Sequence, residues 1–581
     1  MNRTKLSIVL TVILFTAFSR AAFAQSQVGQ KISSFELNDV NNQKWELPKG
    51  KHCIVVFMGV ECPLVKLYAT RLQQIQNEFG GDKIEVVGVN SNQQDSIAEM
   101  QHFARTYELE FKLLKDPGNR VADQFKASRT PEVFLLNDEL RVVYHGAIDD
   151  QYTYGVQKSE VKNHYLRDAL RQSLDGKTIE TAYVEPVGCI IGRKREVDDS
   201  SPVTYSNQIS RILQKNCVSC HRPGEIAPFA LTDYEEVAGW AGMIEEVVRE
   251  KRMPPWHADA PVGHFKNDIR LTDEEKQLIT EWVAAGAPKG NEQQLPKPLA
   301  YPDGWQIGKP DKVIKMRTRP FKVKATGTIE YKYFQVDPGF KKDVWVKAAE
   351  CRPGNRSVVH HIIVGIAGKG EFGGRRGSHG EPESEWVAAT APGSPPAVFP
   401  KGYAKRIPAG SKLVFQMHYT PNGKATTDIS QIGLVFADPA EVKHEVLTQA
   451  VFQTRLKIKP GDPDYQVRAS TRFDRDVELM AMFPHMHYRG KSFVFELRQS
   501  DEQKYERILE VPNYDFNWQN SYELANSIMI RKGAKLRCLA TFDNSEDNLA
   551  NPDPSKTVRW GDQTTDEMMI GYYNIAIPVD L

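Results

Sequence analysis

The chain has 581 residues, and its 75 basic and 74 acidic side chains give a net charge of +1. This balance provides no basic surface for nucleic acid or for an anionic membrane, so neither is an expected partner. Seven cysteines are too few for a disulfide-based scaffold at this length. The length itself predicts three or four domains.

The first 24 residues are predicted to be a secretory signal peptide. Arg3 and Lys5 precede an apolar run over residues 6–18, and Ala22 to Ala24 form a small-residue cleavage site. The run is short for a membrane span, and no other segment of the sequence approaches about 20 apolar residues. The mature protein is therefore expected to be secreted or periplasmic, without a membrane span.

The block at residues 28–180 alternates strands and helices, which predicts an α/β domain. Cys62 lies at a strand-to-helix turn of this block, and Thr130 and Pro131 begin a later strand. The order of elements resembles the thioredoxin-like redoxin superfamily, with Pro131 at the place of its cis-proline. A thiolate at a helix N-terminus is stabilised by the helix dipole, so Cys62 is a candidate redox thiol with a lowered pKa. The segments predicted here are strands over 53–58, 84–89, 130–136 and 141–145, and helices over 64–78 and 96–107.

Cys62 departs from both redox motifs of this superfamily. The second cysteine of a C-x-x-C pair is Val65 here, and the Pro and Thr of a peroxiredoxin are Val55 and Gly59. The local motif therefore supports neither a dithiol oxidoreductase nor an ordinary peroxidase. Cys189, just past the block, is the candidate resolving partner, and a structural or vestigial thiol is the alternative.

Residues 217–221 read C-V-S-C-H, which is the covalent attachment motif of c-type haem. Cys217 and Cys220 would each add to a haem vinyl group, and His221 would be an axial iron ligand. The alternatives are a thioredoxin-type redox pair and half of a zinc site, but the second Cys/His pair that zinc needs is missing from the sequence nearby. The motif therefore predicts haem c.

The segment at residues 203–292 resembles a small class I-like cytochrome c, which implies an all-α domain. Helices are predicted over 205–215, 233–251 and 273–285, and a T-D-E-E capping box at 272–275 opens the last one. The sixth iron ligand should lie between the second and the closing helix. Met253 is the preferred ligand, because a thioether beside a Pro-Pro turn matches Met/His cytochromes, and His257 is the alternative.

Beyond a linker at residues 289–304, short alternating apolar runs and turn residues predict an all-β region. Its strands carry an adjacent pair, His360 and His361, a third histidine at His418, and an H-x-H pair of His485 and His487. The side chains of the H-x-H pair point to one face of a strand and can share a metal. Adjacent residues point to opposite faces, so the adjacent pair needs a bulge or a strong twist to share one.

Together these histidines resemble the copper type II ascorbate-dependent monooxygenases, which include peptidylglycine α-hydroxylating and dopamine β-monooxygenase. The resemblance covers about residues 330–580 and implies tandem β-sandwiches at 305–440 and 441–581, each with one copper. A thioether favours Cu(I) and imidazole suits Cu(II), as a copper that cycles requires. The ligands implied are His360, His361 and His418 for the electron-transfer copper, and His485, His487 and Met568 for the oxygen-activating copper.

The departures from this family concern the substrate. The Arg that peptidylglycine monooxygenase places two residues before H-x-H is Phe483, whereas the family's Tyr after the Met ligand is kept as Tyr572. A peptide carboxylate is thus a poor substrate, and Tyr572 is a candidate substrate contact in a more apolar pocket. The family's cysteine after the Met is Met569, so Cys538 either pairs with Cys351 or stays free.

The combination predicts an oxidoreductase in which haem c exchanges electrons with two copper ions and O₂ oxidises a small organic substrate. A tethered haem raises the local concentration of a one-electron donor to about millimolar, and an external electron donor would reduce it. The redoxin block would be an accessory thiol module, a docking domain or a copper-handling aid. The alternatives are an electron-transfer protein without oxygenase chemistry, a thiol-dependent peroxidase with accessory metal domains, and a copper-binding or assembly-surface protein.

Overall fold

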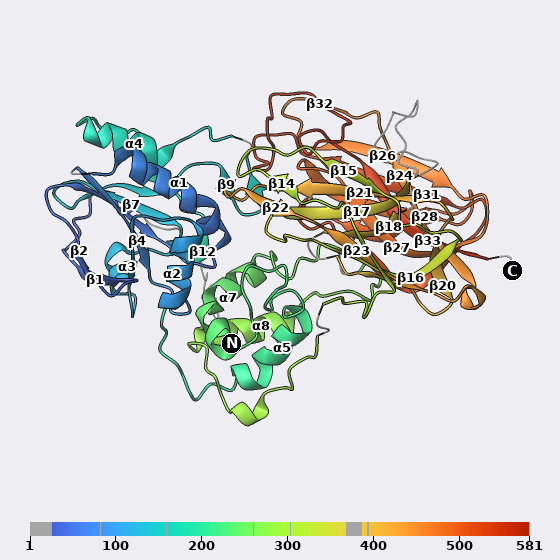
Figure 1. Cartoon of the computed structure of the whole chain (residues 1–581), viewed down its shortest axis with the longest axis horizontal. Coiled ribbons are helices and arrows are strands. Elements are labelled where there is room, and N and C mark those ends of the chain that lie inside the picture. Colours follow the sequence, from blue (N-terminus) through green and yellow to red (C-terminus); the bar gives the residue numbers. More distant parts are fainter. Residues whose placement is uncertain are drawn as a thin grey trace, which may run out of the picture.

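The structure is a computed structural model that describes residues 26–579 except 82, 159, 260, 302–303, 368–385 and 392–393. The predicted signal peptide at residues 1–24 lies outside this description. Three parts follow one another along the chain: an α/β part, a group of short helices, and a large β part (Figure 1). Over the described ranges, no helix has the length and apolar character needed to cross a membrane.

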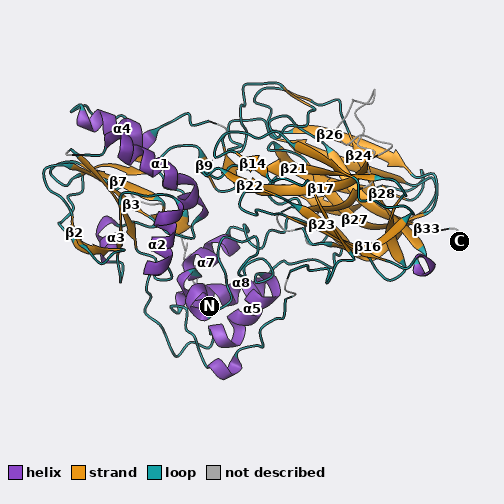
Figure 2. Ribbon diagram, in the orientation of Figure 1, coloured by secondary structure: helices purple, strands orange, loops and turns teal. Residues whose placement is uncertain are grey.

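The first part is a mixed sheet with helices on both faces (Figure 2). Its strands are β1 (Glu36–Asp39), β2 (Lys44–Glu46), β3 (His52–Phe57), β4 (Ile84–Asn90), β5 (Lys112–Lys115), β6 (Arg129–Thr130), β7 (Glu132–Leu136), β8 (Val142–Gly146), β9 (Tyr152–Thr153), β10 (Val156–Gln157), β11 (Tyr183–Val184) and β12 (Cys189–Ile190). Its helices are α1 (Pro63–Phe79), α2 (Ile97–Thr106), α3 (Arg120–Phe125) and α4 (Tyr165–Leu174). Eight strands form one sheet in the order β11-β8-β7-β3-β4-β5-β1-β2.

The central strand β3 explains why this sheet is covered on both faces. Ile54 and Val56 pack into one core with α1, α2 and α4, whereas Val55 and Phe57 pack into a second core with α3. A strand buried on both sides reads as a continuous apolar run, which is the pattern of this segment. The strands and helices predicted for the block are therefore confirmed to within a few residues, and the thioredoxin-like α/β fold with them.

The second part is a compact group of helices that shares a core with the first part. Its elements are the π-helical turn η1 (Tyr205–Ile209), α5 (Ser210–Asn216), α6 (Tyr234–Gly239), α7 (Ala241–Arg249), α8 (Asp273–Ala284) and the 3₁₀ turn η2 (Glu292–Gln294). The capping box of Thr272 and Glu275 at the start of α8 is confirmed.

The single helix predicted over residues 233–251 is wrong, because the chain leaves the helical conformation at Trp240 (φ −92°, ψ 3°). The Trp240 ring stacks on Phe229 at 4.1 Å. At the preceding Gly239, a Cβ atom would lie 2.5 Å from the Cβ of Gln94 in the α/β part. The interruption therefore lies where the helical part packs tightly against the α/β part.

The third part contains three main sheets. Its strands are β13 (Lys312–Lys315), β14 (Phe321–Val323), β15 (Lys332–Val336), β16 (Val344–Arg352), β17 (Val359–Ala367), β18 (Trp386–Thr390), β19 (Ala397–Val398), β20 (Tyr403–Ile407), β21 (Lys412–Tyr419), β22 (Thr426–Asp428), β23 (Gln431–Phe436), β24 (His444–Phe452), β25 (Lys457–Ile458), β26 (Tyr465–Arg472), β27 (Val477–His485), β28 (Gly490–Arg498), β29 (Glu506–Val511), β30 (Tyr522–Ile530), β31 (Lys535–Phe542), β32 (Val558–Arg559) and β33 (Ile570–Pro578), and a 3₁₀ turn η3 (Pro439–Glu441) precedes β24. The largest sheet has nine strands, in the order β13-β23-β16-β20-β24-β33-β27-β30 with β19 beside β16. The two four-stranded sheets are β15-β21-β17-β18 and β26-β31-β28-β29.

The two predicted sandwiches are joined rather than separate. Strands β20 and β24 pair in parallel, with Tyr403 opposite His444, so the largest sheet continues from one half into the other. Each half keeps its own core: one contains Ile362, Phe415 and other residues of β16 to β23, and one contains residues of β27 to β33. The boundary predicted between residues 440 and 441 falls just before this parallel pairing.

Candidate metal and thiol sites

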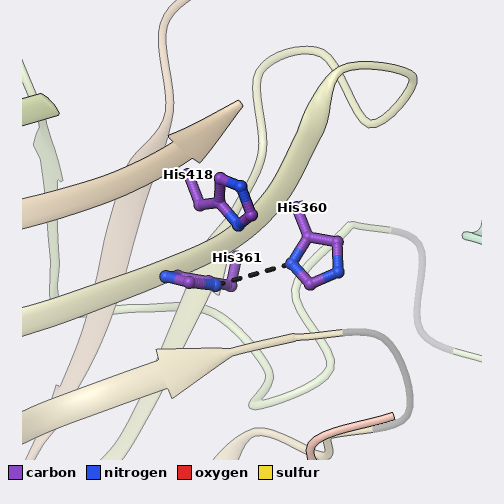
Figure 3. Close-up of side chains that lie close together, drawn as sticks. All are labelled: His360, His361 and His418. Carbon is purple, nitrogen blue, oxygen red and sulfur yellow. Dashed lines mark hydrogen bonds between the residues drawn. The ribbon is translucent and has the colours of Figure 1, made fainter. Parts of the chain in front are cut away.

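Three histidines from two paired strands converge in the first half of the β part (Figure 3). His361 of β17 lies opposite His418 of β21, and a β-bulge falls between Val359 and His361. The bulge brings His360 to the side of the other two, and one ring nitrogen of each lies within 4.8 Å of the others. The irregularity that the adjacent pair requires is therefore present. We call these three residues the first histidine set.

In the first histidine set, His361 and His418 are buried and His360 is half-buried. All three rings are uncharged at neutral pH. Burial lowers the pKa of His360 to about 4, and burial with repulsion from neighbouring histidines lowers those of His361 and His418 well below the usual value. One nitrogen on each ring is buried without a hydrogen-bond partner among the described residues. Such orphaned groups are costly, and the neutral imidazole is the form that binds metals. The set therefore fits a copper ion, for which imidazole is a suitable ligand.

The second histidine set is His485, the last residue of β27, and His487. Nδ1 of His485 lies 2.7 Å from Oε1 of Gln519, and Nδ1 of His487 lies 3.2 Å from the carbonyl oxygen of Asp566. Because both oxygens only accept hydrogen bonds, each Nδ1 carries the proton and each Nε2 keeps its lone pair. Burial lowers the pKa of His485, and that of His487 to about 3. Both rings are thus fixed in the tautomer that presents Nε2 to a metal.

Met568 differs from its neighbour Met569 in its surroundings. Met569 is fully buried in the core of the second half, whereas Met568 is only half-buried and lines a cleft together with His485. Met568, the predicted ligand, is therefore placed at the cleft, whereas its neighbour is a core residue. The assignment of Met568 as a ligand stays a prediction.

One cleft of about 1860 Å³ is lined by one residue of each histidine set, His361 and His485. Its wall beside His485 is aromatic: the ring of Trp386 lies 4.3 Å from that of Tyr572 and 6.5 Å from that of Phe483. The Tyr572 ring itself lies 6.3 Å from the His485 ring. Tyr572 and Phe483 therefore line the cleft beside His485, and Trp386 adds a residue that no motif indicated. The role of Tyr572 as a substrate contact stays a prediction.

Two residues that contact the second histidine set, Glu567 and Gln519, were missed by the sequence analysis. Glu567 is fully buried, and its two side-chain oxygens accept hydrogen bonds from the backbone N–H groups of His487 at 3.0 Å and of Arg489 at 2.7 Å. Burial raises the pKa of Glu567 to about 8. Its place directly before Met568 was a usable signal, whereas Gln519 lies far from the H-x-H pair in sequence and belongs to no motif.

Replacing Glu567 by alanine is expected to lower the free energy of unfolding by about 2 kcal/mol, because two buried N–H groups lose their acceptor. Urea unfolding followed by tryptophan fluorescence would measure this change in the free energy of unfolding. Glu567→Gln keeps one carbonyl oxygen in place and should cost less. An equal loss in both variants would contradict this role.

The C-x-x-C-H motif forms a turn directly after α5. The backbone N–H groups of Cys220 and His221 bond to the carbonyl of Cys217 at 3.1 and 2.9 Å, and both thiols are half-buried. Nδ1 of His221 lies 3.1 Å from the carbonyl oxygen of Phe229, so Nε2 keeps its lone pair. A small crevice of about 250 Å³ next to the motif is lined by Phe229 and Trp240 together with charged and polar residues such as Arg222, Glu61 and Gln94. This arrangement fits a histidine that binds iron, and haem stays a prediction.

Both candidates for the sixth iron ligand lie on the loop between α7 and α8. Met253 precedes a cis peptide bond to Pro254, and its backbone N–H bonds to the carbonyl of Val247 at 3.1 Å. His257 is half-buried, burial lowers its pKa, and its Nε2 has no partner in the described chain. The choice between Met253 and His257 stays a prediction.

Cys62 and Cys189 meet beside Thr130. Cys62 is the N-cap of α1, and the Thr130–Pro131 peptide bond is cis, as expected from the redoxin resemblance. Strand β12 pairs with β6 so that Cys189 lies opposite Thr130, which brings the two thiols into hydrogen-bond contact. The Cys62 thiol also lies 3.0 Å from the carbonyl oxygen of Thr130.

The two thiols are electrostatically unequal. Burial alone would raise the pKa of Cys62, but hydrogen bonds from the Cys189 thiol and the Val65 N–H lower it to about 7. The hydrogen bond to Cys62 and burial raise the pKa of Cys189 well above its usual value. Cys62 is thus the thiol of the pair that more readily becomes a thiolate, and Cys189 is its hydrogen-bond donor.

The other buried cysteines lie apart from this pair. Cys53, Cys351 and Cys538 are free thiols, and each belongs to a different core. Of the two states that the sequence allowed for Cys351 and Cys538, the structure therefore has the unpaired one.

Two protein families match parts of this chain. Residues 28–145 match the AhpC/TSA family, and residues 449–576 match the copper type II ascorbate-dependent monooxygenase C-terminal domain. Cys62 lies in the first match, whereas the second histidine set and Met568 lie in the second. The first histidine set and the C-x-x-C-H motif lie outside both matches.

The N-terminal part is also similar to individual proteins. Thiol-disulfide oxidoreductase ResA of Halalkalibacterium halodurans is 26% identical over 165 residues, which cover 28% of this chain and 89% of that protein. ResA of Bacillus subtilis is 29% identical over 146 residues, which cover 24% of this chain and 80% of that protein. A solved structure of a hypothetical protein from Sinorhizobium meliloti is 28% identical with a TM-score of 0.28, and the match covers 29% of this chain and 96% of that one.

These matches support two oxidoreductase-type domains in one chain. A thioredoxin-like redoxin domain lies near the N-terminus, and a domain of the copper monooxygenase type lies at the C-terminus.

Proposed function

We propose that the chain is a secreted or periplasmic, copper-dependent oxidoreductase that uses O₂ to oxidise a small organic substrate. The observation that carries this proposal is the shared cleft: His361 of the first histidine set and His485 of the second both line it, beside a half-buried Met568. Copper bound by these residues would supply one-electron redox chemistry and the activation of O₂. His360, His361 and His418 would hold one ion, and His485, His487 and Met568 the other.

The residues around the second set would orient its ligands and bind the substrate. Gln519 and the Asp566 carbonyl hold the Nδ1 protons, so Nε2 of both imidazoles would be available to a metal ion. Trp386, Phe483 and Tyr572 would bind an apolar part of the substrate beside His485. Burial of apolar surface against this aromatic wall would favour binding. The proposed substrate is therefore an uncharged organic molecule with an apolar C–H group.

Haem c is proposed as the one-electron donor within the same chain. Cys217 and Cys220 would hold it covalently, His221 would bind the iron through Nε2, and Met253 or His257 would be the second axial ligand. Bound haem would supply electrons one at a time. An external donor would then reduce the haem.

The experiment that tests the proposal is metal and haem analysis of the purified chain, combined with oxygen-uptake screening across uncharged organic substrates. Two copper ions and one covalent haem per chain, with substrate-dependent oxygen uptake, are the expected result. Copper binding with oxygen uptake but no product would favour an electron-transfer protein instead.

A second function is proposed for the Cys62–Cys189 pair. The contact between a thiol of lowered pKa and a thiol of raised pKa favours reversible thiol-disulfide chemistry in the redoxin domain, with Cys189 in place of the missing second cysteine of the C-x-x-C motif. Peroxide turnover or disulfide reduction that Cys62→Ser abolishes would support it.

The Cys62 thiolate is expected to titrate near neutral pH. Because the pKa is lowered to about 7, thiolate absorption assigned by difference to Cys62→Ser should rise through pH 7 and be nearly complete at pH 9. Cys189→Ala removes a hydrogen-bond donor to the thiolate and should move this rise to higher pH. Ser is the matched control at the same position, since Cys189→Ser keeps a donor and should move the rise less. Identical titrations in all three proteins would contradict the pairing.

A further inference from the structure

The loop between β29 and β30, residues 512–521, lies between the two histidine sets. The ring of Phe516 stacks on His360 at 5.4 Å with an interplanar angle of 6°, and it meets His487 edge-on at 6.1 Å. Phe516 is buried, with 6% of its surface exposed. One aromatic side chain therefore contacts both sets and occupies space between them.

Gln519 of the same loop is held on three sides. Its Oε1 accepts the Nδ1 proton of His485 at 2.7 Å, and its Nε2 donates to the carbonyl of Phe516 at 3.2 Å. The backbone carbonyl of Gln519 accepts a hydrogen bond from Ser394 Oγ at 3.2 Å. The orientation of the amide is thus fixed, and the position of His485 depends on the conformation of the loop.

Two asparagines tie this loop to the N-terminal parts of the chain. Asn517 Nδ2 donates to the carbonyl of Gly155 in the α/β part at 2.8 Å. Asn520 Nδ2, on a residue that is 4% exposed, donates to the carbonyl of Pro255 in the helical part at 2.6 Å. Pro255 lies two residues after Met253 on the loop that carries both candidate iron ligands.

The segment that contains Pro255 is fixed along the edge of the largest sheet. Phe265 forms an antiparallel bridge with Leu524 of β30, and the Lys266 N–H bonds to the Glu523 carbonyl at 2.9 Å. The ring of Trp256 meets that of Tyr522 edge-on at 5.0 Å. Backbone pairing and ring packing together make this a specific docking contact rather than an isolated side-chain hydrogen bond.

We propose that the 512–521 loop is a junction through which docking of the helical part sets the geometry of both histidine sets. Asn520 and Gln519 are its positioning residues, and Phe516 fixes the separation of the sets. Covalent and hydrogen bonds run without interruption from Pro255 through Asn520 and Gln519 to His485. The inference rests on the proposed function for the role of the histidines, whereas the docking itself does not depend on bound metal.

The docking is tested by amide hydrogen exchange on the full-length, metal-free chain. Asn520→Ala should speed exchange about fivefold in residues 256–266 and 512–521, because one buried hydrogen bond between the parts is lost. Asn513→Ala is the matched control, since Asn513 is an exposed asparagine of the same loop. Equal exchange in the two variants would overturn the junction.

The effect on the second histidine set is tested by electron paramagnetic resonance of the chain loaded with Cu(II) alone. Gln519→Ala should change the spectrum of one copper and weaken its binding at least about tenfold, because the Nδ1 proton of His485 loses its acceptor. Gln519→Glu restores an oxygen acceptor and should restore the spectrum. Asn520→Ala should shift the same signal, and Asn513→Ala should not. A spectrum unchanged by Gln519→Ala would overturn this inference, whereas a wild-type chain without copper would overturn the proposed function.

Discussion

A chain with His485 replaced by alanine is expected to form product more than about 100-fold more slowly and to bind one copper ion instead of two. Removal of a side chain that hydrogen-bonds to a metal ligand typically lowers metal affinity or activity by about 10–100-fold. Removal of the ligand itself should lower them further. The first histidine set should keep its copper, because β17 and β21 position it within a separate core.

Copper analysis and oxygen uptake on the same samples would measure both effects. The matched control is His264→Ala, which removes an exposed histidine close to the edge of the largest sheet. This control should keep both copper ions and full activity. Two copper ions and wild-type turnover in His485→Ala would end the proposal that this residue is a ligand.

Met568→Ala should separate the two oxidation states of the same site. A thioether prefers the softer ion, so its loss should weaken Cu(I) binding more than Cu(II) binding. Met529, which is 49% exposed, provides a control substitution that should change neither affinity. Equal weakening of both oxidation states would show that Met568 contributes packing rather than a ligand atom.

Part of the site could be predicted from local sequence because four of its five histidines, His360, His361, His418 and His485, lie in strands. The i, i+2 spacing of His485 and His487 predicts that both lie on one side of an extended chain, and their rings lie 5.3 Å apart although His487 follows the end of β27. The adjacent residues His360 and His361 can share a metal only if the strand is irregular, and no residue type in the sequence indicates such an irregularity. In the structure it is a β-bulge. The pairing of Cys62 with Cys189 could also be predicted. Because Val65 replaces the second cysteine of the C-x-x-C motif, a partner for Cys62 had to be sought elsewhere in the sequence.

The features that were missed depend on tertiary contacts. Strands β20 and β24 pair in parallel within one sheet. Their alternation of apolar and polar residues would be the same if they belonged to two separate sheets, so the sequence does not predict this pairing. The helix is interrupted at Trp240, where Gly239 packs against Gln94 of the α/β part. The apolar periodicity of the sequence continues through this position and so predicts one unbroken helix. Gln519 and Phe516 carry no metal-binding motif, and their role follows only from where the β29–β30 loop lies.

Covalent haem is expected to disappear when Cys217 and Cys220 are both replaced by alanine. Each thiol would form one thioether bond, so the wild-type chain should keep its haem through denaturing extraction and the double variant should lose it. The turn that carries both thiols also positions His221, whose Nδ1 bonds to the Phe229 carbonyl. The double variant could therefore still bind haem through iron, but only non-covalently.

The absorption of the extracted, denatured protein measures this loss directly. Ser219→Ala is the control, because Ser219 is exposed and lies between the two cysteines. Met253→Ala should remove low-spin methionine ligation and lower the reduction potential, and His257→Ala should leave the spectrum nearly unchanged. The reverse pattern would assign the iron to His257. Haem that survives extraction from the double variant would exclude thioether attachment at these cysteines.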